Sequence, residues 1–139
     1  MRYYLDTQTL AQYILQRGAE AAAIRLIFED YGNLFYTSSV CVKELVHLIQ
    51  AGRIRPAGRN RQYNAYEVIQ NIIRAGVEII PANVLHLQQM SQLPYFDEHN
   101  DPNDRLIIAQ AITDRVPIIT TDLKFELYIP SGLSVVPNR

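Results

Sequence analysis

Four acidic residues, Asp6, Glu44, Asp104 and Asp122, occupy positions where a carboxylate is otherwise hard to explain. Asp6 and Asp122 directly follow short apolar runs that are typical of strands, RYYL and PIITT. Glu44 and Asp104 fall on the apolar faces of predicted helices. Carboxylates brought close together raise one another's pKa unless a cation neutralises them. The pattern therefore predicts a site for a divalent ion such as Mg²⁺ or Mn²⁺.

Each of these acids also has a purely structural explanation. Asp6 suits a helix N-cap and Asp122 suits a turn, and for both residues the two explanations are evenly balanced. Glu44 lies on the same helical stripe as Leu48, where an ion pair or a side chain extended to solvent is the alternative to a ligand. Asp104 also suits the first turn of a helix, whose dipole favours negative charge. The four acids together are more specific than any one of them.

A fifth acid, Asp101, stands next to Pro102 in a pattern that starts a helix, with Asp as the N-cap and Pro at the first helical position. Capping is therefore favoured for Asp101, and metal ligation is the alternative. Cys41 is the only cysteine and no two histidines have ligand spacing, so the donors are oxygens. Oxygen donors favour Mg²⁺ or Mn²⁺ over Zn²⁺.

Short apolar runs alternate with helical patterns along the whole chain. Strands are predicted at Tyr3–Leu5, Leu34–Tyr36, Val77–Ile80, Val116–Thr120 and Leu133–Val136. Helices are predicted at Thr9–Gln16, Ala19–Tyr31, Val40–Ala51, Asn64–Ala75, Asn83–Gln92 and Asn103–Asp114. We expect an α/β fold with a central, mostly parallel sheet of four to five strands. Ligands bind beyond the carboxyl ends of such strands, where Asp6 and Asp122 fall.

The composition indicates one globular domain spanning residues 1–139. The chain has 48% hydrophobic and 19% charged residues, and its net charge of −1 does not indicate a non-specific nucleic-acid binder. We find neither a signal-peptide pattern nor an apolar run of membrane-spanning length. A single cysteine excludes a disulfide framework. We therefore expect a cytoplasmic protein that does not associate with membranes.

Four local strings, in this order along the chain, resemble those of the PIN-domain family. They are LDTQTL, SSVCVKELVHLIQAGRI, HNDPNDRLIIAQA and IITTDLKF, and DPNDRLIIAQA is the most specific part. The chain most resembles the VapC-type ribonuclease toxins of prokaryotic toxin–antitoxin pairs. The resemblance implies a three-layer α/β/α sandwich and Mg²⁺- or Mn²⁺-dependent hydrolysis of RNA phosphodiester bonds, which leaves 5′-phosphate and 3′-hydroxyl ends. It also implies a cognate antitoxin as partner and a homodimer.

The resemblance assigns roles to individual residues. The positions that match the family's acidic, metal-binding quartet are Asp6, Glu44, Asp104 and Asp122. Thr120 matches a hydroxyl that orients the last acid or a bound water, and Asp101 matches an auxiliary acid of one branch. The chain departs from the family pattern at Gln8, Lys43 and Asn103. None of these departures removes an acid, so they bear on substrate contacts and not on catalysis.

Several basic residues are candidates for contacts with substrate phosphates or an acidic partner. Four of them crowd one polar loop, which is equally well explained as a solvated loop: Arg53, Arg55, Arg59 and Arg61. Lys43 and Arg105 adjoin the predicted site acids, and Arg105 is as well explained by a structural ion pair. His99, a single histidine in a loop, is expected to be solvated, with RNA binding as the alternative.

Two other functions are compatible with parts of this pattern. A non-catalytic PIN-like module for RNA binding or assembly would not need the intact acidic quartet. A phosphatase with a strand-end aspartate nucleophile, of the haloacid-dehalogenase type, would need a second acid where the chain has Gln8. The metal-dependent ribonuclease is the function that the sequence favours.

Overall fold

A central sheet of five parallel strands organises the computed structural model, which describes residues 1–16, 18, 20–58 and 60–139. The strands are β1 (Arg2–Leu5), β2 (Leu34–Ser38), β3 (Glu78–Ile80), β4 (Ile118–Thr120) and β5 (Val135–Pro137). Their order in the sheet is β3-β2-β1-β4-β5, and every pair is parallel. The predicted α/β fold with a mostly parallel sheet is confirmed.

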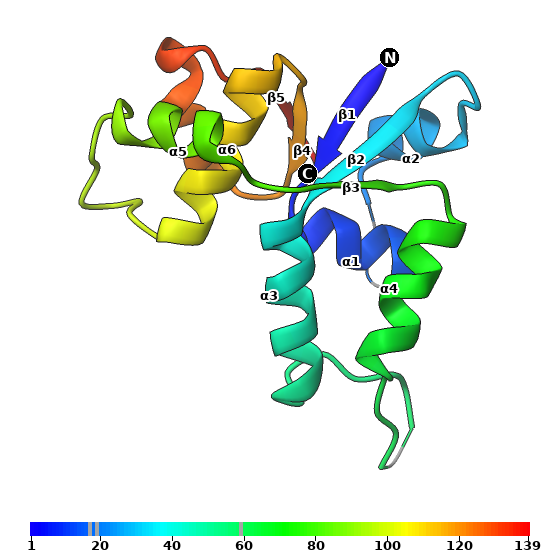
Figure 1. Ribbon diagram of the computed structural model, residues 1–139. Coiled ribbons are helices and arrows are strands. Elements are labelled where there is room, and N and C mark those ends of the chain that lie inside the picture. The colour runs from blue at the N-terminus through cyan, green and yellow to red at the C-terminus, as the bar shows by residue number, and fades with distance from the viewer. Residues whose placement is uncertain (17, 19, 59) are drawn as a thin grey trace.

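Helices cover both faces of the sheet (Figure 1). On one side lie α1 (Thr7–Leu15), α2 (Ala22–Glu29), α3 (Ser39–Gln50) and α4 (Ala65–Arg74). On the other side lie α5 (Val84–Ser91), α6 (Pro102–Asp114) and the 3₁₀-helix η1 (Leu123–Ser131). The chain moves from β1 to β3 in one direction and then returns past β1 to β4 and β5. Because crossovers between parallel strands are right-handed, this reversal moves the later helices to the opposite face.

The strands are apolar on both faces because both faces are covered. Leu5 in β1 and Ile118 and Ile119 in β4 are fully buried. Parallel sheets enclosed in this way read as continuous apolar runs instead of alternating ones. This is why short segments such as RYYL and PIITT were recognisable as strands.

The helix starts follow the local chemistry of the sequence. Asp6 caps α1 by accepting a hydrogen bond from the Thr9 N–H at 2.8 Å, and Ser38 caps α3 through the Val40 N–H at 3.0 Å. Asp101 caps α6, so the predicted capping role is confirmed. The helix predicted from Ala19 begins at Ala22; Ala19 itself lies outside the described residues.

The 3₁₀-helix η1 was not predicted. It has three residues per turn and contains Pro130, so it shows neither the spacing of an α-helix nor the alternation of a strand. It nevertheless buries Phe125 and Tyr128, which pack beside α6. Its start at Asp122 places that acid at a helix terminus directly after β4.

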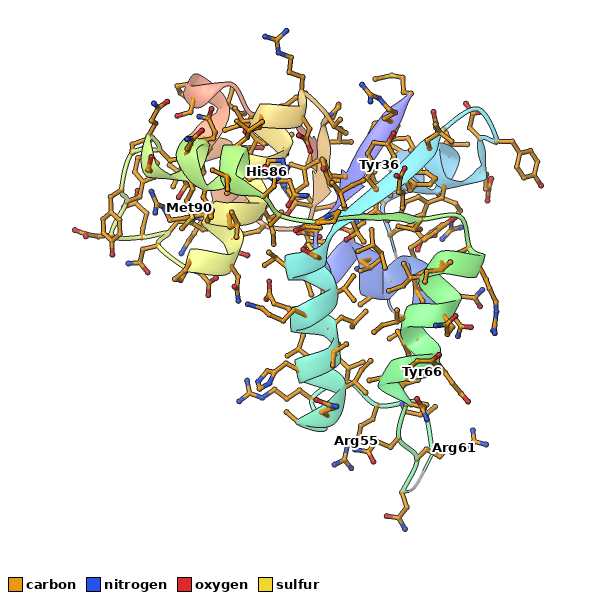
Figure 2. All side chains as sticks on the ribbon, viewed as in Figure 1. Tyr36, Arg55, Arg61, Tyr66, His86 and Met90 are labelled. Atoms are coloured by element: carbon orange, nitrogen blue, oxygen red, sulfur yellow. The ribbon has the colours of Figure 1, made fainter. Side chains whose placement is uncertain are left out.

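A buried polar network joins the sheet to α5 and α6. The Tyr4 hydroxyl donates a hydrogen bond to Asp114, and it accepts one from Gln110 Nε2 at 3.4 Å. Asp114 also pairs with His86 Nε2 at 3.0 Å (His86 is labelled in Figure 2). Gln110 Nε2 reaches the Ile80 carbonyl at 3.0 Å, which ties in the end of β3. Buried groups of this kind contribute to stability only while all of them remain paired.

We expect Tyr4→Phe to lower the free energy of unfolding by about 1–3 kcal/mol, because it removes the hydrogen bonds of the buried hydroxyl to Asp114 and Gln110. Tyr3→Phe is the matched control, since the neighbouring tyrosine hydroxyl only meets the weak acceptor Met1 Sδ, at 3.6 Å. That variant should change stability by less than about 0.5 kcal/mol. Urea denaturation of both variants measures the difference. Equal losses in the two would show that the network adds nothing.

Candidate metal centre

A cavity of about 470 Å³ opens at the carboxyl edge of the sheet. It is lined by Asp6, Thr7, Gln8, Gln12, Glu44, Leu48, Asp104, Thr121, Asp122 and Phe125. The structure thus brings together all four acids that were selected from the sequence. They arrive from three separate parts of the chain, after β1, on α3, and around α6 and β4.

Asp6 is held from two sides. Its side chain is buried, one oxygen accepts the capping hydrogen bond of α1, and the other accepts a hydrogen bond from Thr120 Oγ1 at 2.5 Å. Thr120 Oγ1 also accepts a hydrogen bond from the Asp122 N–H at 3.0 Å. Thr120 therefore links the first acid to the last one across the β1–β4 pair.

Glu44 reaches the cavity from the second turn of α3. Its Oε1 accepts a hydrogen bond from Thr7 Oγ1 at 3.2 Å, which connects α3 with the start of α1. The side chain is half-buried at the edge of the core. The position fits the sequence argument that a carboxylate on this apolar stripe needs a partner.

Asp104 and Asp122 face a histidine that the sequence argument had expected to be solvated. His99 is only 6% exposed, and its Nε2 lies 3.4 Å from Asp104 Oδ2 and 3.8 Å from Asp122 Oδ2. Each of these three side chains has one potential ligand atom in a cluster in which all three atoms lie within 4.8 Å of one another. Asp6 and Glu44 line the same cavity outside this tighter group.

The electrostatics of the cavity disfavour the ionised acids. Burial, followed by repulsion from the other acids of the site, raises the pKa of Asp104 to about 7. Burial likewise raises the pKa of Asp6, although the hydrogen bonds from Thr120 and Thr9 oppose this effect. Burial also raises the pKa of Glu44, against the hydrogen bond from Thr7. A cation bound among these groups would relieve both the repulsion and the cost of desolvation.

The donors present fit a divalent ion. The four carboxylates supply oxygen ligands, and His99 Nε2 is a buried polar atom without a hydrogen-bond partner in the described chain. Asp101, the auxiliary candidate, instead directs Oδ1 to the N–H groups of Asn103 and Asp104, at 2.8 and 3.1 Å. It nevertheless contributes negative charge, since it raises the pKa of Asp104.

The basic candidates lie at different distances from the cavity. Lys43 Nζ donates a hydrogen bond to Asn103 Oδ1 at 3.0 Å, which connects α3 with α6 beside Glu44. Both residues are positions where the chain departs from the family pattern. The Arg105 guanidinium instead donates to the Leu93 carbonyl at 3.3 Å and lies over the ring of Tyr95, 5.5 Å from its centroid. Arg105 thus anchors the loop before α6.

The arginine-rich loop lies at the end of α3 that is remote from the sheet. Figure 2 places Arg55 and Arg61 at this extremity, and Arg53 is exposed at the start of the loop. Arg59 lies outside the described residues. The loop and the acidic cavity are therefore separated along α3, which spans Ser39–Gln50.

Sequence reasoning did not select Thr7, and it expected His99 to be solvated, with RNA binding as the alternative. Thr7 directly follows Asp6 at the first position of α1, a place from which its hydroxyl can reach the neighbouring helix. His99 precedes the helix start Asp101-Pro102 by two residues, but its orientation depends on η1, which was itself not predicted. Proximity to an acidic helix start was the one available signal.

Comparison with known proteins identifies the family of the chain. A family model described as PIN domain matches residues 3–128. No curated protein sequence matches the chain. Because the family match covers most of its length, the chain belongs to the PIN-domain family.

Solved structures share the fold at low sequence identity. A chain of VapBC2 from Rickettsia felis, bound to a DNA fragment from its promoter, is 18% identical, with 100% of both chains covered and a TM-score of 0.67. DNA-bound VapBC from Salmonella typhimurium gives 19% identity, 99% and 98% coverage and a TM-score of 0.67. VapC20 from Mycobacterium tuberculosis, described as a Sarcin-Ricin loop cleaving toxin, gives 17% identity, 97% and 98% coverage and a TM-score of 0.61.

We expect the metal-free protein to lose stability as the pH rises from about 4 to about 7. The Asp104 carboxyl keeps its proton up to about pH 7 in the folded chain, whereas its ordinary value is 3.8. In this range the folded chain binds more protons than the unfolded chain, so raising the pH favours unfolding. Asp104→Asn should reduce this dependence of stability on pH. At about pH 8 its free energy of unfolding should exceed that of the wild type by roughly 1 kcal/mol.

Urea denaturation in the presence of a chelator, repeated across this pH range, measures the slope. Asp97→Asn is the matched control, because Asp97 is an exposed acid in the loop before the same helix. It should retain the slope of the wild type. The same slope in Asp104→Asn as in Asp97→Asn would contradict the electrostatic account of the cavity.

Proposed function

We propose that this protein is a Mg²⁺- or Mn²⁺-dependent endoribonuclease that acts as the toxin of a toxin–antitoxin pair. The observation that carries the proposal is the convergence of four carboxylates on one cavity at the carboxyl edge of the sheet. A cluster this acidic suits a divalent ion, and the reaction that such an ion assists in a nuclease is phosphodiester hydrolysis. Membership of the PIN-domain family and the description of VapC20 as a Sarcin-Ricin loop cleaving toxin support RNA as the substrate.

The contacts and burial of each site residue indicate a different role for it. Asp104 and Asp122 would hold the ion together with Asp6, whose position Thr120 secures. When bound, the ion lowers the pKa of a coordinated water and neutralises charge that develops on the phosphate. Glu44 accepts a proton from the attacking water, a role that its half-buried position and raised pKa favour. Thr7 orients the Glu44 carboxylate through its hydroxyl.

The partners follow from the same comparison. The similar structures include VapBC complexes bound to DNA, which supports a cognate antitoxin as the partner of this chain. The homodimer is expected from the resemblance to VapC-type toxins alone. Among the described residues, no helix combines the length and apolar character needed to cross a membrane. We expect the protein to act in the cytoplasm.

Purified protein should cleave RNA in the presence of Mg²⁺ or Mn²⁺, and a chelator should stop the reaction. Asp6→Asn and Asp104→Asn should each lower the rate by about a hundredfold or more, because each removes a charged group that holds the ion. Asp97→Asn again serves as the control and should cleave at the wild-type rate. Full activity in Asp6→Asn, or in chelator, would disprove the metal mechanism. RNA binding without cleavage by the wild type would support a non-catalytic module instead.

Expression of the gene should arrest growth of the host cell, whereas expression of Asp6→Asn should not, since it removes cleavage and leaves the surface unchanged. Co-expression of a small neighbouring gene should restore growth if that gene encodes the antitoxin. Colony counts after induction provide the measurement. Harmless expression of an active nuclease would remove the toxin role and leave the ribonuclease assignment in place.

A further inference from the structure

The side chain of His99 is fixed in place by the residues around it. Its ring lies edge-on to Phe125 and Tyr128, with centroids 5.6 and 5.3 Å away. The backbone of its loop is tied to η1, because Lys124 Nζ donates to the Glu98 carbonyl at 3.0 Å and the Tyr128 hydroxyl donates to the His99 carbonyl at 3.1 Å. The imidazole is thus a rigid element of the cavity wall.

The hydrogen bonds determine which nitrogen of the neutral ring carries the proton. The single hydroxyl hydrogen of Tyr128 is donated to the His99 carbonyl. With a hydrogen on His99 Nδ1, the contact between Nδ1 and the Tyr128 oxygen, at 2.9 Å, is a hydrogen bond as well, so this tautomer satisfies both contacts. The lone pair of the neutral ring then resides on Nε2, which is buried and has no hydrogen-bond partner among the described residues.

This lone pair faces two carboxylates. Nε2 lies 3.4 Å from Asp104 Oδ2 and 3.8 Å from Asp122 Oδ2. Once both acids are ionised, an acceptor opposite two acceptors is unfavourable without a cation between them. Two ligands that each lie about 2.1 Å from one ion are about 3.0–4.2 Å apart, depending on the angle between them. Both measured separations fall in this interval.

We propose that His99 Nε2 is a nitrogen ligand of the metal, next to Asp104 and Asp122, and that the site consequently selects Mn²⁺ over Mg²⁺. Imidazole binds first-row transition ions well, whereas Mg²⁺ prefers oxygen donors. This inference rests on the metal site of the proposed function and adds the identity of one ligand and of the preferred ion. The alternative is an imidazolium that pairs with the same two carboxylates and excludes cations.

The two variants that test the proposal are His99→Asn and His47→Asn. The amide nitrogen of asparagine can take the place of Nδ1 and keep the hydrogen bond to Tyr128, while Nε2 is removed. His47 is the matched control, because it is exposed and lines a neighbouring cavity that Glu44 shares. Circular dichroism and thermal unfolding of the metal-free proteins establish that both variants fold.

Pulsed electron paramagnetic resonance of bound Mn²⁺ reads the ligand directly through its coupling to ¹⁴N. The coupling should be present in the wild type and in His47→Asn, and absent in His99→Asn. Calorimetry should show a loss of Mn²⁺ affinity of at least about tenfold in His99→Asn and a smaller loss for Mg²⁺. Persistent coupling in His99→Asn, or tighter Mn²⁺ binding by that variant, would overturn the proposal; tighter binding is the result that a cationic His99 predicts.

A second measurement needs no variant. His86 accepts a hydrogen bond from the Asn83 N–H on Nδ1, at 3.0 Å, so its neutral ring is protonated on Nε2, opposite to His99. In ¹⁵N spectra of the wild type, Zn²⁺ should shift the resonance of the unprotonated Nε2 of His99, whose ring carries its proton on Nδ1. No shift there would count against the proposal. RNA cleavage without nitrogen coupling would overturn this inference alone, whereas failure of the wild type to bind Mn²⁺ or Mg²⁺ would overturn the proposed function as well.

Discussion

The parallel pairing of β1 with β4 is the constraint on which the site depends. Leu5 is in register with Ile119, so Asp6 and Thr120, the next residue of each segment, emerge side by side. The hydrogen bond of 2.5 Å between them fixes the first carboxylate at this edge. Parallel strands end at one edge, so helices that begin there carry their first turns to the same place. Topology thus collects acids that are more than a hundred residues apart, as Asp6 and Asp122 are.

Crowding the carboxylates costs stability, and the fold offsets this cost unevenly. Asp6 receives hydrogen bonds from Thr9 and Thr120. Among the described residues, no group donates a hydrogen bond to the Asp104 carboxylate, and its pKa rises to about 7. The least compensated acid is therefore Asp104, one of the two acids that face His99. In physical terms, this is the part of the cavity where a bound cation contributes most to stability.

Much of this arrangement could be predicted because it depends on local chemistry. The role of Asp101 as a cap follows from its neighbour Pro102, and Asp6 was placed at the end of a strand by the apolar run before it. The orientation of His99 could not be predicted, because it is set by Tyr128 and Phe125 on a 3₁₀-helix without a recognisable period. Spacing along the chain identifies elements reliably and says little about loops that tertiary packing shapes.

The arginine-rich loop shows that closeness in sequence does not predict which charged residues lie near the site. The loop directly follows the helix that bears Glu44, yet Figure 2 shows Arg55 and Arg61 at the end of α3 that is remote from the sheet. Lys43 is the basic residue whose charge lowers the pKa of Glu44, against burial and the neighbouring acids that raise it. Under the proposed function, a phosphate that enters this cavity meets four carboxylates, so their charge must be neutralised before RNA can bind productively. Affinity for the rest of the RNA then has to come from surfaces outside the cavity, and Arg53 and Arg61 are exposed basic side chains that do not belong to its lining.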